Sequence, residues 1–282
     1  MLAAVEAGGT KFRVAVLDRE FEIVAQEWIP TTSPEETIGA CASFFADHEV
    51  SALGIASFGP LVVDRSSPDY GSISATPKRG WSGAALLGRL QAALDVPADM
   101  QTDVEAAAVA ESRLGAGKGY SLVGYVTVGT GVGAAVAVDG IAYRGRTHTE
   151  LGHIPVRRAD GDSFAGVCPF HSDCLEGMAS GPAIARRCGA DPTELDGRDG
   201  LWDLEASYLA QLVRVLTLSF APDVVLFGGG VGARPDMAER ISKAVEVDLA
   251  GYAEGPPTIA TAGLGGDAGL VGAALIAADL TD

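Results

Sequence analysis

Cysteine and histidine residues gather in one short stretch of the chain. Cys168, His171 and Cys174 are separated by two-residue gaps, and His153 precedes them by a loop. Thiolates and imidazoles are the ligands of structural zinc sites, in which four protein ligands surround the ion as a tetrahedron. The spacing therefore predicts a structural zinc site made of His153, Cys168, His171 and Cys174. The alternative is that these are two incidental buried cysteines and two surface histidines.

The segment between these ligands contains few residues that could pack into a core. We expect residues 157–170 to depend on the bound ion for their order, because burial alone offers little there. Two carboxylates, Glu150 and Glu176, flank the ligands in sequence. A carboxylate on a rigid backbone is suited to accept hydrogen bonds from neighbouring hydroxyl groups, so a sugar is the expected ligand of this stretch.

The same stretch carries a family resemblance. E-L-G-H at 150–153 and C-P-F-H-S-D-C-L-E-G-M-A-S-G-P-A-I at 168–184 resemble the ROK family of sugar kinases, and in particular its bacterial fructokinase branch. The resemblance extends over nearly the whole chain. It implies that Glu150, His153 and Glu176 hold the sugar, and that His153 is also a zinc ligand.

A helix start farther upstream supplies a candidate catalytic base. Transfer of a phosphoryl group to a sugar needs a carboxylate that orients the hydroxyl and accepts its proton. T-D-V-E-A-A-A at 102–108 matches the family pattern T-D-V-N-A-A-A, which implies that Asp103 is this base and that Thr102 contacts the sugar. The alternative is a capping box between Thr102 and Glu105. Glu105 stands where the family usually has Asn.

Gly59 is a further candidate for the sugar site. It follows the apolar segment Ala52–Ser57, which reads as a buried strand, and it precedes Pro60. The carboxyl end of a central strand is where α/β folds place ligands. A simple tight turn is the alternative.

Glycine turns appear twice within the same local plan of strand, turn and strand. Backbone N–H groups of such turns can face a phosphate, although a plain hairpin would use the same residues. Neither turn matches the two common phosphate-binding motifs. The repetition predicts a duplicated α/β architecture. The resemblance implies that ATP contacts Gly8, Gly9, Thr10, Lys11, Gly129, Thr130, Gly131, Pro182, Gly228, Gly229, Gly230 and Val231, and that Glu6 holds magnesium through water.

Composition excludes several classes of protein. The net charge of -17 argues against a nucleic-acid partner, because no basic surplus could neutralise phosphates. The uncharged run 119–138 is long enough to span a membrane, but its glycines predict a buried hairpin instead. The chain opens with no basic segment, so we expect no secretion signal. Four cysteines without an export signal then suggest the cytoplasm.

We therefore expect an α/β protein with the actin-like ATPase fold, a duplicated ribonuclease H-like fold of two lobes with a zinc-binding loop. The small lobe would span 1–114 and include the C-terminal helix 268–282, and the large lobe would span 115–267. The expected activity is ATP-dependent phosphorylation of a hexose, fructose first, at its 6-hydroxyl. The expected cofactors are structural Zn²⁺ and Mg²⁺, with ATP as co-substrate, in a homodimer without membrane contact.

Other functions share many of these features. Within the same family, the alternatives are a glucokinase, a mannokinase or an N-acetylhexosamine kinase. A sugar-responsive repressor is a remote alternative, since the chain starts directly in a strand and is acidic. A zinc-stabilised sugar-binding protein would leave the repeated glycine turns without a role.

Overall fold

The computed structural model describes residues 1–253 and 255–281, and its chain divides into two compact units. The first unit comprises Met1–Ala110, Ala142–His148 and Asp267–Asp282, and the second comprises Glu111–Ile141 and Thr149–Gly266. The short segment Ala142–His148 therefore belongs to the first unit, although the chain on both sides of it belongs to the second.

The first unit is built on a five-stranded sheet in the order β3-β2-β1-β4-β5. Its strands are β1 (Leu2–Ala7), β2 (Lys11–Leu17), β3 (Ile23–Pro30), β4 (Ala52–Ser57) and β5 (Ala98–Thr102). β1 pairs antiparallel with β2 and parallel with β4, and β4 pairs parallel with β5. Nearly every side chain of β1 and β4 is buried, as is typical of strands covered on both faces.

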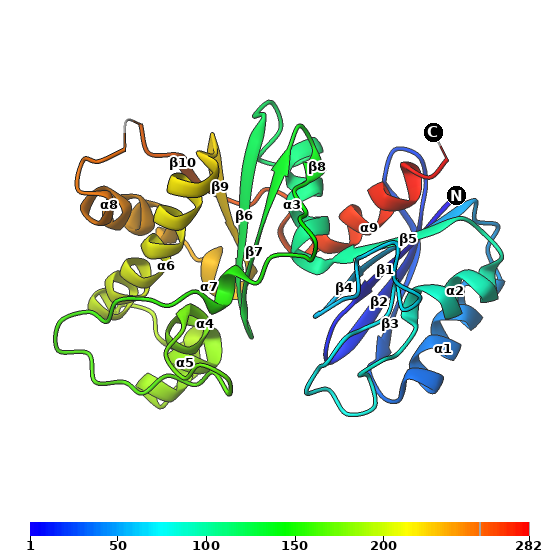
Figure 1. Ribbon diagram of the computed structural model, residues 1–282, viewed down its shortest axis with the longest axis horizontal. Coiled ribbons are helices and arrows are strands. Elements are labelled where there is room, and N and C mark those ends of the chain that lie inside the picture. Colours follow the sequence, from blue (N-terminus) through cyan, green and yellow to red (C-terminus); the bar gives the residue numbers. More distant parts are fainter. Residues whose placement is uncertain (254, 282) are drawn as a thin grey trace. The chain divides into compact units, whose positions relative to one another are not determined.

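Helices cover both faces of this sheet. The helices are α1 (Pro34–Ala46), α2 (Leu86–Leu94), α9 (Ala268–Ala278) and the first part of α3 (Asp103–Arg113). Figure 1 shows α1 and α2 on one face of the sheet and α9 on the other. α9 lies very close to β4, because a Cβ atom added at Gly54 would lie 1.8 Å from the backbone oxygen of Ala273. Glycine at this position is therefore a packing requirement.

The second unit repeats this plan with a second sheet, in the order β10-β9-β6-β7-β8. Its strands are β6 (Leu122–Val128), β7 (Val132–Val138), β8 (Ile141–Ala142), β9 (Val224–Gly228) and β10 (Thr258–Thr261). β6 pairs antiparallel with β7 and parallel with β9, as β1 does with β2 and β4. The two strand orders correspond one to one, so the prediction of a duplicated α/β architecture is confirmed.

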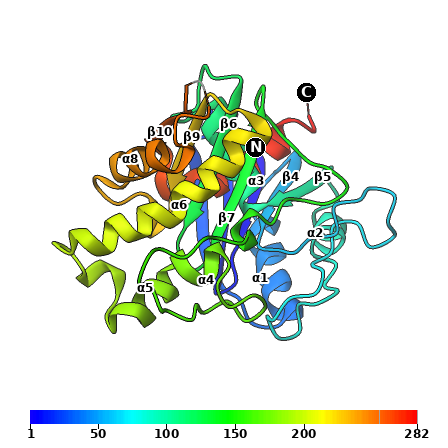
Figure 2. The same cartoon turned by 60° about the vertical axis from the view of Figure 1, so that its left-hand side comes forward.

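Helices and short 3-10 helices complete the described part of the second unit. They are η1 (Leu151–His153), α4 (Leu175–Ala179), α5 (Gly181–Cys188), η2 (Pro192–Glu194), α6 (Asp199–Phe220), α7 (Gly229–Gly232) and α8 (Met237–Leu249), and η3 (Gly265–Asp267) leads into α9. α6 and α8 lie side by side (Figure 2). The core of this unit joins the apolar faces of α4, α6 and α8 to β6, β7 and β9.

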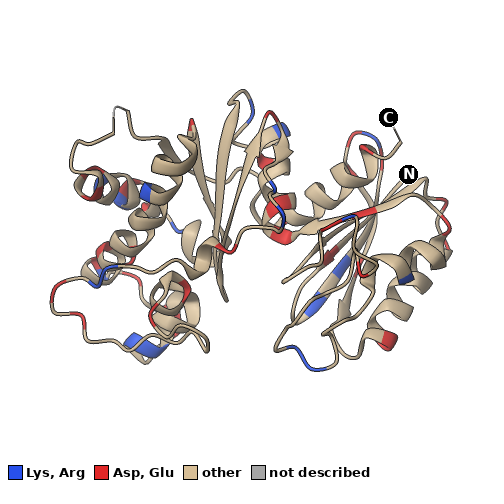
Figure 3. Ribbon diagram, viewed as in Figure 1, with Lys and Arg blue, Asp and Glu red and all other residues tan. Residues whose placement is uncertain are grey.

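The long uncharged run of the sequence forms the β6–β7 hairpin, as predicted. The strands of this sheet carry almost no charged residues, whereas the helices and loops carry many (Figure 3). Throughout residues 1–253 and 255–281, none of the helices has the length and apolar character needed to cross a bilayer.

Two helices of the first unit begin at well-defined positions. α1 follows the Ser33 cap and ends at Ala46. α3 begins at Asp103, directly after the last residue of β5. As a consequence, Asp103 occupies the junction between β5, which is partly buried, and α3.

Candidate active site and metal centre

Three candidate segments of the first unit meet at one edge of its sheet. Ala7 of β1 pairs with Ser57 of β4, and Ser57 pairs with Thr102 of β5, all in parallel register. The carboxyl ends of parallel strands lie at the same edge, where α/β folds bind ligands. The glycine turn at Gly8, the turn at Gly59 and the start of α3 at Asp103 therefore share this edge.

Asp103 is the first residue of α3, and the helix start around it is a complete capping box. The Glu105 N–H donates to Thr102 Oγ1 at 3.2 Å, and the Thr102 N–H donates to Glu105 Oε2 at 3.1 Å. The Val104 N–H donates to Asp103 Oδ1 at 2.9 Å. The capping interpretation is thus confirmed for Thr102, which is buried. It does not compete with a catalytic role for Asp103, whose carboxylate is not part of the box.

Glu6 lies in an unusual electrostatic environment at the same edge. Burial raises the pKa of Glu6 from 4.5 to about 7, Arg13 opposes this rise, and the charge of Asp103 adds to it. The side chain of Glu6 lies against α9, where a Cβ atom added at Gly269 would be 2.5 Å from Glu6 Oε1. A cation at this edge would relieve the repulsion between the two carboxylates.

The first glycine turn is held by backbone hydrogen bonds. The Gly8 N–H donates to the Lys11 oxygen at 3.1 Å, and the Thr31 N–H donates to the Thr10 oxygen at 2.9 Å. Lys11 Nζ lies 3.7 Å from the centroid of the Trp28 ring. Gly9 lies between these anchored residues, and a Cβ atom there would meet nothing within 4 Å. The turn is therefore fixed at its ends and open at its centre.

The second unit brings its own glycine segments together at the equivalent edge. The Gly181 N–H donates to the Gly129 oxygen at 2.7 Å, which places the α5 start, with Pro182, beside the β6–β7 turn. A Cβ atom at Gly229 would lie 2.4 Å from the Val128 oxygen. Three groups of candidate ATP contacts thus lie together: Gly129, Thr130 and Gly131; Pro182; and Gly228, Gly229, Gly230 and Val231.

Glu176 and η1 also converge on the start of β7. Glu176 Oε2 accepts a hydrogen bond from the Val132 N–H at 3.1 Å. Gly152 packs on the same strand so closely that a Cβ atom would lie 1.7 Å from the Val132 oxygen. Because Gly152 stands between Glu150 and His153, these three candidate sugar ligands belong to one region of the second unit. Asp103 belongs to the first unit.

The four candidate metal ligands form one cluster. The ligand atoms of His153, Cys168, His171 and Cys174 all lie within 4.8 Å of one another. His153 Nδ1 is 3.5 Å from Cys174 Sγ and 3.7 Å from Cys168 Sγ. A tetrahedral zinc site with ordinary bond lengths has N···S edges of about 3.6 Å. The donor set and these two distances therefore fit a zinc ion.

The loop that leads to this cluster has its own anchors, contrary to the sequence expectation. Gln211 of α6 accepts from the Arg157 N–H at 2.7 Å and donates to the Arg157 oxygen at 2.9 Å. Asp162 is paired with Arg187 at 2.7 Å and accepts from the Tyr208 hydroxyl at 2.5 Å. These contacts hold the first half of 157–170 independently of an ion. These contacts were not predictable from the sequence, because the partners are distant in the chain.

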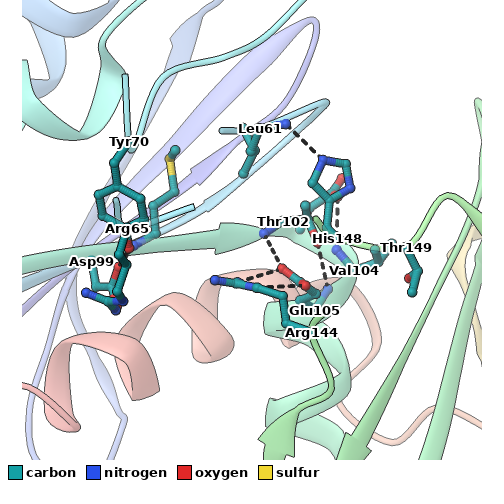
Figure 4. Close-up of polar contacts among 12 residues, drawn as sticks. Leu61, Arg65, Tyr70, Asp99, Thr102, Val104, Glu105, Arg144, His148 and Thr149 are labelled. Atoms are coloured by element: carbon teal, nitrogen blue, oxygen red, sulfur yellow. Dashed lines mark hydrogen bonds and ion pairs between the residues drawn. The ribbon is translucent and has the colours of Figure 1, made fainter. Parts of the chain in front are cut away.

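A buried ion pair beside the helix start was also missed. Arg144 donates to both carboxylate oxygens of Glu105, from Nε at 3.1 Å and from Nη2 at 2.8 Å (Figure 4). Burial lowers the pKa of Arg144, but its hydrogen bonds to Glu105 and the charge of that carboxylate raise it overall. The signal in the sequence was Glu105 itself, since a carboxylate in an alanine-rich buried helix requires a cation.

The fold, the candidate active-site residues and the candidate metal ligands can now be compared with a known protein family. The family model described as "ROK family" matches residues 2–280. The chain belongs to the ROK family, and the resemblance stated from its motifs is confirmed.

Individual relatives cover the same length. The chain is 41% identical over 280 residues to a fructokinase of Pediococcus pentosaceus, covering 98% of this chain and 97% of that protein. It is 29% identical over 313 residues to a glucokinase of Streptomyces coelicolor, covering 97% of this chain and 96% of that protein. A crystal structure of a ROK family glucokinase from Streptomyces griseus, in complex with glucose and AMPPNP, is 27% identical, with a TM-score of 0.77 and 99% of each chain covered.

Proposed function

We propose that this protein phosphorylates a hexose at its 6-hydroxyl with ATP as donor, and that fructose is the preferred sugar. The observation that carries the proposal is the position of Asp103. It begins a helix at the same sheet edge as a glycine turn, in a chain 41% identical to a fructokinase over nearly its whole length. A carboxylate in this position suits the proton transfer that phosphorylation of an alcohol requires.

The proposed roles follow the chemistry of the reaction. The 6-oxygen of the sugar attacks the γ-phosphorus of ATP, the bond from that phosphorus to the bridging oxygen breaks, and ADP leaves. Asp103 accepts the hydroxyl proton as the new bond forms. Glu150, His153 and Glu176 seat the sugar ring, and backbone N–H groups of the glycine turns hold the phosphates. Magnesium, with Glu6 as its candidate partner through water, would neutralise charge on the phosphates.

We propose that the cluster of two cysteines and two histidines holds a structural zinc ion. All four positions would be filled by the protein, so no coordination place would remain for a substrate. The ion would fix the segment that carries Glu176, because Cys174 lies two residues before it. We further propose that the protein acts as a homodimer in the cytoplasm, as expected from the family; light scattering would test the dimer.

Fructose is favoured over glucose by the pattern of similarity. Two relatives named as fructokinases are 41% and 40% identical to this chain, whereas the glucokinase of Streptomyces coelicolor is 29% identical. Sugars that differ at one or two carbons can be separated by a single hydrogen bond. A glucokinase, mannokinase or N-acetylhexosamine kinase is therefore the alternative that a substrate panel must address.

An assay of ADP release across fructose, glucose, mannose and N-acetylated amino sugars tests the proposal. Asp103→Asn should lower kcat by at least about 100-fold, while fructose still binds with nearly unchanged affinity. Asp95→Asn is the matched control, since Asp95 is exposed at the end of α2 with a positive φ that Asn also adopts. Near-normal turnover of Asp103→Asn would refute the assignment of the base.

A further inference from the structure

Glu105 and Arg144 form an ion pair in which the carboxylate is buried and both of its oxygens accept hydrogen bonds from the guanidinium group. The side chain of Glu105 is 1% exposed and that of Arg144 is 22% exposed. Each carboxylate oxygen receives one guanidinium N–H, and Oε2 also accepts from the Thr102 N–H. A carboxylate this deeply buried is stable in its charged form only when a cation and hydrogen bonds compensate it. Arg144 therefore holds the Glu105 carboxylate in its place in the capping box.

Arg144 reaches Glu105 from a segment that is fixed at a second point. His148 is 8% exposed, and its Nε2 accepts a hydrogen bond from the Leu61 N–H at 3.0 Å. A Cβ atom at Gly59 would lie 3.7 Å from Cε1 of the same ring. Figure 4 shows the two anchors together, with Arg144 on Glu105 and His148 on Leu61. The segment Ala142–His148 is thus attached both to the start of α3 and to the turn that follows β4.

We propose that Arg144 is a positioning residue for Asp103 and acts through Glu105. This inference rests on the proposed function, in which Asp103 is the base. Asp103 and Glu105 share the first turn of α3, and Asp103 Oδ1 is held by the Val104 N–H of that turn. Arg144 keeps the Glu105 carboxylate aimed at the Thr102 N–H, which fixes the turn and with it the direction of the Asp103 carboxylate.

Loss of Arg144 has a defined chemical consequence. The Glu105 carboxylate then loses both guanidinium hydrogen bonds and turns toward water, which weakens its bond to the Thr102 N–H. The first turn of α3 loosens, and Asp103 samples directions from which it cannot reach the hydroxyl. Because catalysis depends on the reacting groups being held in place, this change lowers kcat more than it alters the binding of either substrate.

The test compares Arg144→Ala with Glu105→Gln and with the double variant in the full chain. For Arg144→Ala we expect kcat to fall about tenfold or more, with KM values for fructose and ATP changed less than about threefold. The double variant should recover part of the lost kcat, because it leaves no uncompensated charge. Guanidinium at low, non-denaturing concentration should restore activity to Arg144→Ala, whereas equal sodium chloride should not.

Arg89→Ala is the matched control. Arg89 pairs with Glu35 at 3.2 Å in the same unit, so the variant removes an arginine–glutamate pair that lies away from the helix start. Its kcat should remain within about twofold of the parent, since exposed ion pairs contribute little. If Arg144→Ala behaves like Arg89→Ala, or if its loss of kcat is not rescued by guanidinium, the proposal is wrong.

Amide hydrogen exchange separates this inference from the proposed function. Arg144→Ala should accelerate exchange of the amides at 104–107, which begin α3, while amides of α1 exchange as in the parent protein. This measurement needs no turnover. If the parent protein phosphorylates no hexose, the proposed function fails, and exchange at 104–107 still decides whether Arg144 orders the helix start. Unchanged exchange there would overturn the positioning role.

Discussion

Replacing Glu6 by glutamine should change how stability depends on pH. Burial raises the pKa of Glu6 from 4.5 to about 7, with Arg13 opposing the rise and Asp103 adding to it. In the unfolded chain the carboxyl group returns to its ordinary pKa. Because the pKa is raised in the folded state, the folded protein favours the neutral carboxyl group. The contribution of Glu6 to the free energy of unfolding is therefore fully present below pH 4.5 and is lost as the pH rises through 7.

The magnitude follows from the two pKa values. They lie about 2.5 pH units apart, and each unit corresponds to about 1.4 kcal/mol, so ionising Glu6 in the folded protein costs about 3.4 kcal/mol in full. About 2.5 kcal/mol of this cost develops between pH 5 and pH 8. Glu6→Gln keeps the shape of the neutral acid and cannot ionise, so it should lack this part of the pH dependence.

Urea unfolding of the parent protein and of Glu6→Gln, at pH 5 and pH 8 without nucleotide or magnesium, measures the difference. The free energy of unfolding of the parent should fall relative to the variant by about 2–3 kcal/mol between the two pH values. Equal pH dependence in both proteins would refute the argument that the burial of Glu6 outweighs the charge of Arg13. Magnesium should reduce the difference if Glu6 faces the ion, because a cation favours the ionised carboxylate.

Two further perturbations test the metal cluster and the packing of α9. Relative to the untreated protein, a strong chelator should add two thiols, Cys168 and Cys174, to those that react with a disulfide reagent, whereas Cys41, which is fully buried, should stay unreactive in both states; an increase of none, or of three, would contradict this. Gly54→Ala should lower the free energy of unfolding by about 2 kcal/mol or more in urea, because its Cβ atom would overlap the backbone of α9. Gly39→Ala, in α1 with nothing within 4 Å of an added Cβ atom, should instead raise it by about 0.5–1 kcal/mol.

The duplicated fold was predictable because its signals are local. The pattern of strand, glycine turn and strand appears twice, and each copy reflects alternation and turn chemistry within about 20 residues. The capping box at Thr102 and Glu105 is likewise written in four consecutive positions. The metal cluster was predictable for a similar reason, since three of its ligands lie within seven residues.

The contacts that were missed join residues distant in sequence. Arg144 is 39 positions from Glu105, and Gln211 is 54 positions from Arg157. No periodicity or motif links such pairs, because only the folded topology brings the segments together. The sequence therefore indicated only a bound metal as the source of a fixed conformation for the loop before Cys168. In the structure, side chains of α6 hold this loop by hydrogen bonds. A charge in an apolar helix was the one clue available, and it indicated a partner without identifying it.

The burial of α9 bears on how the protein is made. Residues 268–277 cover one face of the first sheet, yet they follow the whole second unit in the chain. During synthesis on the ribosome, β1, β2 and β4 emerge long before this helix. Until α9 has been synthesised, the apolar face of these strands that it covers stays exposed and can contact other chains. Nascent chains stalled before residue 268 should therefore be the form most dependent on chaperones.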